Sequence, residues 1–215
     1  MKKQIALCAV TLFTLAGSAF AVAVDCNSLT TFQDYIDQSA EGGCFVQDKL
    51  FSNFDYTGGG VVTASNVSVG IVFSPAPGQD IHGFIFSPLG APVWTADFSF
   101  GYTIAVDPPN PMVNITGAKL QSNLGILANP ASAVSTKGNG LVQTAVFGDE
   151  TAIDTFAGVQ SLTSSTAVTM NGGFLISLEE NYTQTLTGVP EPGTSLLFTG
   201  GLGLLLLGRL ARRKA

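Results

Sequence analysis

The sequence has 215 residues, of which 46% are hydrophobic and only 11% are charged, and its formal net charge is −6 at pH 7. Residues 24–188 hold fourteen acids against three lysines and no arginine, a formal charge of −11. This excludes nucleic acids as partners, because their phosphates are bound by Lys and Arg. About 165 residues can bury one core, and the acidity suits a protein that stays soluble outside the cell.

Residues 1–23 have the three parts of a secretory signal peptide. Lys2 and Lys3 precede the apolar run Ile5–Leu15, and small residues follow that run. Cleavage after Ala21 or after Ala23 fits the A-x-A pattern equally well. We therefore expect the protein to be exported, with either cleavage position open.

Two cysteines, Cys26 and Cys44, remain after the leader is removed, because Cys8 lies inside it. An exported protein meets an oxidising environment, which predicts a disulfide between them. The alternative is a thiol or metal pair. A single histidine in the chain, His82, makes a Cys/His metal site a poor alternative.

The stretch 27–43 has the only helical periodicity in the body of the chain. Its apolar residues recur at three- and four-residue spacing, namely Leu29, Phe32, Tyr35 and Ile36. We predict a short helix here. Ser28 or Thr30 is expected to cap it, and the glycines at 42 and 43 to end it.

From residue 44 onward the pattern is typical of β-strands separated by Pro-, Gly- and Asn-rich turns. We predict strands within 49–56, 61–73, 81–86, 93–106, 112–128, 133–147, 159–170 and 174–187, with a hairpin turn at 137–140. The clearest alternation places five residues on one face: Phe98, Phe100, Tyr102, Ile104 and Val106. Seven to nine strands with little helix predict an all-β fold, an antiparallel β-sandwich of jelly-roll type. A barrel is the weaker alternative.

The C-terminal tail contains three features in a fixed order. They are the motif Val189, Pro190, Glu191 and Pro192; the apolar run 195–207; and the basic cluster Arg209, Arg212, Arg213 and Lys214. An apolar run followed by positive charge predicts a transmembrane helix within 195–215 whose basic end stays in the cytoplasm. Residues 24–187 then form one domain outside the inner membrane, and 188–194 are a Pro/Gly linker.

This tail resembles the PEP-CTERM sorting signal of Gram-negative bacteria, many of which secrete exopolysaccharide. The resemblance implies that exosortase, a membrane-embedded sorting enzyme, recognises and processes the tail. The segment D-K-L-F-S-N-F-D-Y, residues 48–56, also resembles the start of the extracellular domain in a group of PEP-CTERM proteins. Both resemblances imply an inner-membrane-anchored precursor that passes to the periplasm, outer surface or matrix, and neither implies a chemical activity.

The residues do not assemble into a catalytic constellation. His82 lies inside a short strand and is the only histidine available to a Ser-His-Asp triad. Glu179 and Glu180 are neighbours in a strand, so they point to opposite faces and cannot flank one glycosidic bond. The acids at 149, 150 and 154 lack the spacing of a known calcium loop. We predict no enzyme activity, no cofactor and no metal site.

The leading interpretation is an exported, non-catalytic protein of the envelope or exopolysaccharide matrix. The alternative is a carbohydrate-binding or adhesion module, because sugar sites use exposed aromatic faces with polar groups nearby. Trp94, Tyr56 and Tyr102 are the candidate ligand aromatics, with Tyr182 beside them. A secreted hydrolase is the third interpretation.

Overall fold

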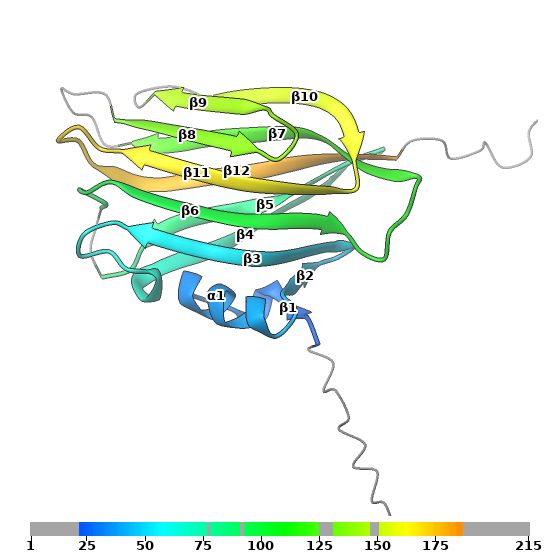
Figure 1. Cartoon of the computed structure of the whole chain (residues 1–215), viewed down its shortest axis with the longest axis horizontal. Coiled ribbons are helices and arrows are strands. Elements are labelled where there is room, and N and C mark those ends of the chain that lie inside the picture. Colours follow the sequence, from blue (N-terminus) through cyan, green and yellow to red (C-terminus); the bar gives the residue numbers. More distant parts are fainter. Residues whose placement is uncertain (1–21, 77, 91–92, 125–130, 147–150, 187–215) are drawn as a thin grey trace, which may run out of the picture.

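The computed structural model describes residues 22–76, 78–90, 93–124, 131–146 and 151–186. Figure 1 shows two β-sheets stacked face to face, with one helix along one side of the stack. The predicted leader up to Ala21 and the whole tail from Val189 to Ala215 lie outside the described residues. Within the described ranges, no helix has the length and apolar character needed to cross a membrane.

The two sheets together contain twelve strands in the described part of the chain, more than the seven to nine predicted. The larger sheet has the spatial order β1 (Val24–Asp25), β2 (Cys44–Val46), β3 (Lys49–Gly58), β6 (Phe98–Val106), β11 (Ser161–Thr169), β8 (Ser132–Lys137) and β9 (Val142–Val146). The smaller has the order β10 (Thr151–Val159), β7 (Val113–Leu124), β12 (Leu175–Leu186), β5 (Gln79–Pro88) and β4 (Val67–Ala76). Among the described strands, β1 and β2 are the one parallel pair. Two separate sheets make the fold a sandwich.

One α-helix, α1 (Phe32–Ala40), follows the short 3₁₀ turn η1 (Cys26–Ser28). Its cap is Thr31, one residue after the predicted Thr30 and three after Ser28. Thr31 Oγ1 accepts a bond from Asp34 N at 3.3 Å, and the Asp34 carboxylate accepts from Thr31 N at 2.8 Å, which is a capping box. Thr31 is the N-cap because Asp34, at the third helical position, can accept a bond from the Thr31 backbone.

Helix α1 buries Phe32 and Tyr35 on its inner face. It packs against β3, β4 and the 3₁₀ turn η2 (Ala64–Asn66), and so covers the open side of the sandwich between the two sheets (Figure 1). The rings of Phe32 and Phe54 meet edge to face at 5.8 Å. The helix therefore belongs to the same core as the sheets.

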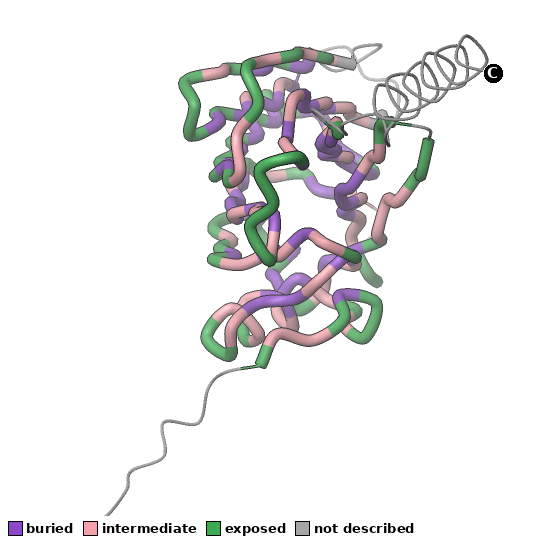
Figure 2. The backbone as a smooth tube through the Cα atoms, turned by 90° about the vertical axis from the view of Figure 1, so that its right-hand side faces the viewer, coloured by how far each residue is buried: buried purple, intermediate pink, exposed green. Residues whose placement is uncertain are grey.

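The core lies between the sheets, where Figure 2 shows the buried segments in purple and the turns exposed in green. The five residues predicted to share one face of β6 are all buried, with exposures of 4% or less. Aromatic rings continue the core across the smaller sheet, for example Phe86 against Phe100 at 4.6 Å. Each such side chain contributes about 1.5–3 kcal/mol on burial.

The strand predictions differ from the structure in several places. The predicted strand 93–106 begins only at Phe98, with Trp94 forming an isolated bridge to Leu175, and the short strands β1 and β2 were not predicted. The predicted strand 61–73 begins only at Val67, because residues 64–66 form η2 and Val61 is 77% exposed. Strand β10 was not predicted, because it is an edge strand whose inner row, Ala152, Asp154 and Phe156, is only half-buried and gives weak alternation. The hairpin predicted at 137–140 is confirmed by the pairing of β8 with β9.

Candidate functional site

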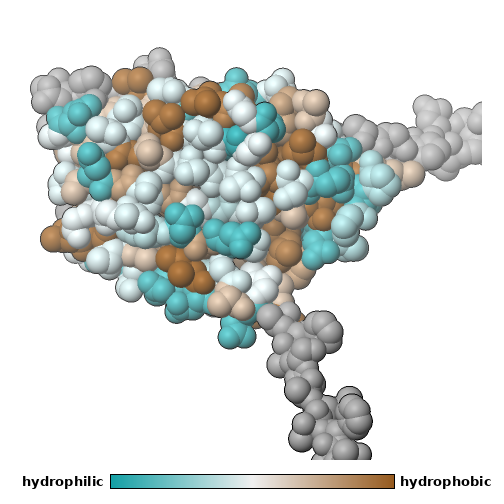
Figure 3. All heavy atoms as spheres, viewed as in Figure 1, coloured by the Kyte–Doolittle hydropathy of each residue, from teal (hydrophilic) through white to brown (hydrophobic). Residues whose placement is uncertain are grey.

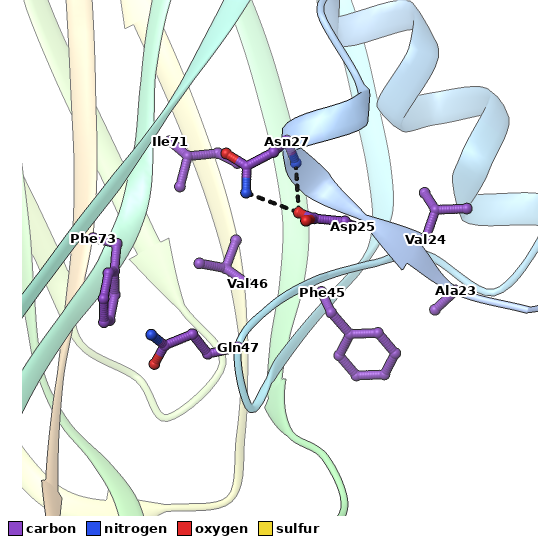
Figure 4. A pocket seen from close by; sticks show the side chains of 9 residues that line it. All are labelled: Ala23, Val24, Asp25, Asn27, Phe45, Val46, Gln47, Ile71 and Phe73. Carbon is purple, nitrogen blue, oxygen red and sulfur yellow. Dashed lines mark hydrogen bonds between the residues drawn. The ribbon is translucent and has the colours of Figure 1, made fainter.

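A cleft of about 660 Å³ lies between edge strand β4 and the segment formed by β1, η1 and β2 (Figure 4). Nine residues line it: Ala23, Val24, Asp25, Asn27, Phe45, Val46, Gln47, Ile71 and Phe73. The cleft therefore combines an apolar wall from one sheet with polar side chains from the other.

The apolar wall comes from the inward row of β4. The row begins with Val67 and Val69, which are buried under the helix region, and continues with Ile71 and Phe73, which are only half-buried. Val46 of β2 is buried on the other side of the cleft. Because β4 is the last strand of its sheet, no other described strand pairs with it beside Ile71 and Phe73. A ligand in the cleft thus meets the Phe73 side chain directly (Figure 4).

The polar groups come from η1 and from the turn between β2 and β3. Asp25 Oδ1 accepts hydrogen bonds from Asn27 N at 2.9 Å and from Asn27 Nδ2 at 2.8 Å. These bonds, with the backbone donor contributing most, lower the pKa of Asp25, so this carboxylate is ionised at neutral pH. Gln47 is exposed at the tip of the turn, with a φ of 56°, and its amide points toward Phe73 in Figure 4.

The predicted disulfide is present and holds the polar side of the cleft. Cys26 of η1 and Cys44 of β2 are bonded, and both are buried. The Tyr35 hydroxyl donates a bond of 3.0 Å to the Cys26 carbonyl, which ties the same turn to helix α1. Asp25 and Asn27 are the neighbours of Cys26 in the chain. The disulfide and the bond from Tyr35 therefore hold both residues in place opposite β4.

His82 lies behind the apolar wall and does not line the cleft. Its ring centroid is 5.3 Å from that of Phe73, and its side chain is fully buried. Burial, with the nearby Lys49 ammonium second, lowers the pKa of His82 to about 4, so the ring is neutral at pH 7. Neither ring nitrogen has a hydrogen-bond partner among the described residues, so His82 belongs to no catalytic triad there.

The aromatic residues predicted as ligand contacts lie in the core. Trp94 is fully buried, stacks on Phe98 at 4.8 Å and donates its indole N–H to the Tyr56 hydroxyl at 3.0 Å. Tyr56 is half-buried and donates to the Val62 carbonyl. Tyr102, like Tyr182, is 1% exposed. Their rings contact other core groups. The aromatic residues of the cleft are Phe45 and Phe73, and the sequence analysis named neither as a ligand contact.

A second polar group of residues is sealed between the sheets. Its members are Tyr102 of β6, Ser135 and Lys137 of β8, Ser164 and Thr166 of β11, and Glu180 and Tyr182 of β12, all at 1% exposure or less. Lys137 Nζ donates to Ser135 Oγ and Ser164 Oγ at 2.7 Å each. Glu180 accepts from Tyr102 at 2.8 Å, from Ser135 at 2.7 Å and from Thr166.

This buried group is a structural network. Burial raises the pKa of Glu180, but the Lys137 ammonium and the surrounding hydroxyl donors outweigh it and lower that pKa overall. Burial opposes the charge on Lys137 too, and Glu180 outweighs that effect to raise its pKa. Ser135, Lys137 and Glu180 are residue types that also occur in hydrolase active sites. Here all three side chains are fully buried, so a substrate cannot reach them. The charged pair instead joins the two sheets.

Glu179 and Glu180 point to opposite faces of β12, as predicted. Glu180 is buried, whereas Glu179 is partly exposed and pairs with Lys119 at 3.0 Å. They therefore do not form a pair of glycosidase carboxylates. The described residues contain no group of three or more His, Cys, Asp or Glu placed to hold a metal. Residues 149 and 150 of the acidic cluster lie outside the described ranges, and Asp154 accepts a bond from Gln143.

The outer face of the larger sheet carries small polar side chains along its central strands. Figure 3 shows this face with many pale residues of intermediate hydropathy, among scattered hydrophilic and hydrophobic ones. The outward row of β11 is Ser161, Thr163, Ser165, Ala167 and Thr169. Hydroxyls are available on this face, but its central strands present no aromatic platform, so the cleft beside β4 is the better candidate.

No family model matches this chain, and no curated protein matches it. Solved structures with some likeness include TmCBM61 in complex with β-1,4-galactotriose, at 12% identity and a TM-score of 0.32, covering 63% of this chain and 89% of that one. The family 11 carbohydrate-binding module of the cellulosomal cellulase Lic26A-Cel5E of Clostridium thermocellum has 12% identity and a TM-score of 0.29, with 63% and 88% covered.

A family 11 module from Clostridium thermocellum in complex with a β-1,3-1,4-mixed-linked tetrasaccharide has 12% identity and a TM-score of 0.30. That match covers 63% of this chain and 89% of the module. TM-scores this low establish neither a shared topology nor a shared ligand.

Proposed function

We propose that this chain is an exported, non-catalytic, carbohydrate-binding β-sandwich of the cell envelope or exopolysaccharide matrix. The observation that carries the proposal is the cleft beside β4, where an apolar wall faces several hydrogen-bonding side chains. A sugar presents an apolar C–H face and a rim of hydroxyls, so a sugar site needs both kinds of contact. Pockets for small ligands have this composition, mostly apolar with a few placed polar groups.

The cleft supplies the two kinds of contact from opposite sides. Phe73 and Ile71 offer the apolar surface on which the C–H face of a sugar can pack. Asp25, Asn27 and Gln47 offer a carboxylate and two amides to sugar hydroxyls. The disulfide between Cys26 and Cys44 keeps these groups in place before a ligand arrives, which lowers the entropic cost of binding.

The residues that line the cleft support the proposal that it binds without catalysis. Asp25 is the single acidic side chain among the nine lining residues, whereas glycoside hydrolysis uses two carboxyl groups on either side of the bond. The lining residues include no histidine, serine, threonine or cysteine to act as a nucleophile or base. Binding without turnover is the chemistry that this set of residues supports.

Export is supported by the disulfide, because such bonds persist in oxidising compartments. We propose further that exosortase sorts the protein through Pro190, Glu191 and Pro192 after a membrane-anchored stage. This part rests on the tail sequence alone. Mass spectrometry of the protein recovered from the cell surface tests it by giving both termini. A surface fraction that still carries Arg212 and Arg213 would contradict processing of the tail.

Affinity electrophoresis of the exported domain in gels containing polysaccharides tests the carbohydrate site. Phe73→Ala and Gln47→Ala should each raise the Kd derived from the retardation by at least about tenfold, which corresponds to 1.4 kcal/mol of binding free energy. Ile153→Ala, an equally apolar truncation at a 68% exposed position of β10, should leave retardation unchanged. Circular dichroism verifies that each variant is folded. If a polysaccharide retards the folded Phe73 and Gln47 variants as strongly as the wild type, the cleft is not the site.

A further inference from the structure

We infer that the carbohydrate held by this cleft is a neutral polysaccharide and not an acidic one. The inference rests on the proposed function and adds the ligand class to it. It follows from the positions of the cationic side chains in the exported body, each of which already has an acidic partner.

All three lysines of the body already have an acidic partner. Lys49 Nζ lies 2.7 Å from Asp48 Oδ1, and the Lys49 side chain is 1% exposed. Lys137 Nζ lies 3.3 Å from Glu180 with both side chains fully buried. Lys119 pairs with Glu179 at 3.0 Å and is the one lysine side chain with substantial exposure, at 31%.

No other side chain of the body replaces these lysines. Residues 24–188 contain no arginine, and His82 is buried and neutral. Recognition of a carboxylate or sulfate normally uses charge-assisted bonds from Arg or Lys. The net charge of −11 on the same residues repels a polyanion over the Debye length of about 8 Å at physiological salt.

The cleft itself is negative or neutral. Its one ionisable side chain is Asp25, which is a carboxylate at neutral pH. Leader removal after Ala21 or Ala23 leaves an α-ammonium on Val22 or Val24, only three or one residues from Asp25 in the chain, so the two charges offset each other. An acidic sugar would meet no excess of positive charge there.

Neutral hydroxyls match the remaining hydrogen-bonding capacity. Asp25 Oδ1 is occupied by Asn27, while Oδ2 has no partner in the described part of the chain and can accept from a hydroxyl. The Gln47 amide has both a donor and an acceptor group and is exposed to solvent. A polyol satisfies these groups without bringing a charge into the cleft.

Affinity electrophoresis with paired gels tests the ligand class. The neutral gels contain a galactan or a mixed-linkage glucan, the acidic gels contain polygalacturonate or alginate, and all contain 150 mM salt and EDTA to prevent bridging by divalent cations. We expect retardation in at least one neutral gel and none in the acidic gels. Retardation only in acidic gels would overturn the ligand class and leave the proposed carbohydrate binding standing, whereas no retardation in any gel would overturn both.

Charge variants at the rim of the cleft make the test specific to this site. Gln47→Lys adds a cation where the wild type has none, and it should create retardation by polygalacturonate. Gln47→Glu is the matched control, because it adds a negative charge at the same position. The acidic gels should not retard this variant. If the wild type is retarded by polygalacturonate as strongly as Gln47→Lys, an anionic ligand is already accommodated and the inference fails.

Discussion

Lys137 Nζ lies 3.3 Å from Glu180 Oε1, and this ion pair joins β8 of one sheet to β12 of the other with both side chains fully buried. Removing one partner leaves an uncompensated buried charge, so Glu180→Leu or Lys137→Met alone should destabilise the fold by about 3–5 kcal/mol. The double variant removes both charges and should cost much less than the sum of the two. Urea unfolding of the four proteins measures the coupling, and simple additivity would show that the pair does not interact.

His82 should make the protein less stable in mild acid. Its pKa is about 4 in the fold and 6.5 when exposed, so between these pH values the unfolded chain binds a proton that the folded chain excludes. Stability contributed by neutral His82 is therefore full above pH 6.5 and is lost as the pH falls toward 4, by roughly 1–3 kcal/mol. The charged groups acting on the ring are Lys49, Asp48 and Asp80.

The measurement compares wild type with His82→Phe by urea unfolding at pH 7 and pH 4.5. The variant retains an aromatic ring against Phe73 and cannot titrate. Carboxylates that titrate in this range affect both proteins equally, so the wild type should lose more stability than the variant. Equal losses would mean that His82 is protonated in the fold without penalty.

The features predicted well from the sequence are the ones that depend on local patterns. Strand β6 alternates strictly and has its five large residues buried, as expected. The opposite directions of Glu179 and Glu180 follow from strand geometry alone. The pairing of Cys26 with Cys44 follows from the exclusion of Cys8 from the mature chain. Each of these needs no knowledge of which strands are neighbours.

The cleft and the buried network depend on long-range topology, which local patterns do not contain. Phe73 and Asn27 line the same cleft because β4 is the edge strand next to the N-terminal segment. Glu180 meets Lys137 because their strands face each other across the core. Charged residues are almost never fully buried without a partner, so a single sequence assigns both to the surface. The Ser and Thr residues of β11 that face inward were the one local sign of a polar interior.

Reduction of the disulfide should destabilise the fold and loosen the cleft. Cys26 and Cys44 are 18 residues apart, and a loop of this length corresponds to roughly 3 kcal/mol on the chain-entropy model. Thermal unfolding with and without dithiothreitol should show a lower midpoint for the reduced protein. A Cys26→Ala/Cys44→Ala variant should match the reduced wild type and respond to the reductant no further. An unchanged midpoint would mean that η1 and β2 are held without the bond.

Gly83 of β5 should be intolerant of any side chain. A Cβ there would collide with the Glu180 carbonyl oxygen and lie 2.7 Å from Asn181 Cα, both in the paired strand β12. Gly83→Ala must therefore push β5 from β12 and should destabilise by about 3 kcal/mol or more. Gly70→Ala in β4 is the matched control, because its nearest atom is 3.7 Å away and alanine is favoured over glycine in strands by roughly 0.5–1 kcal/mol. Similar unfolding midpoints for the two variants would mean that β5 and β12 do not approach as closely as described.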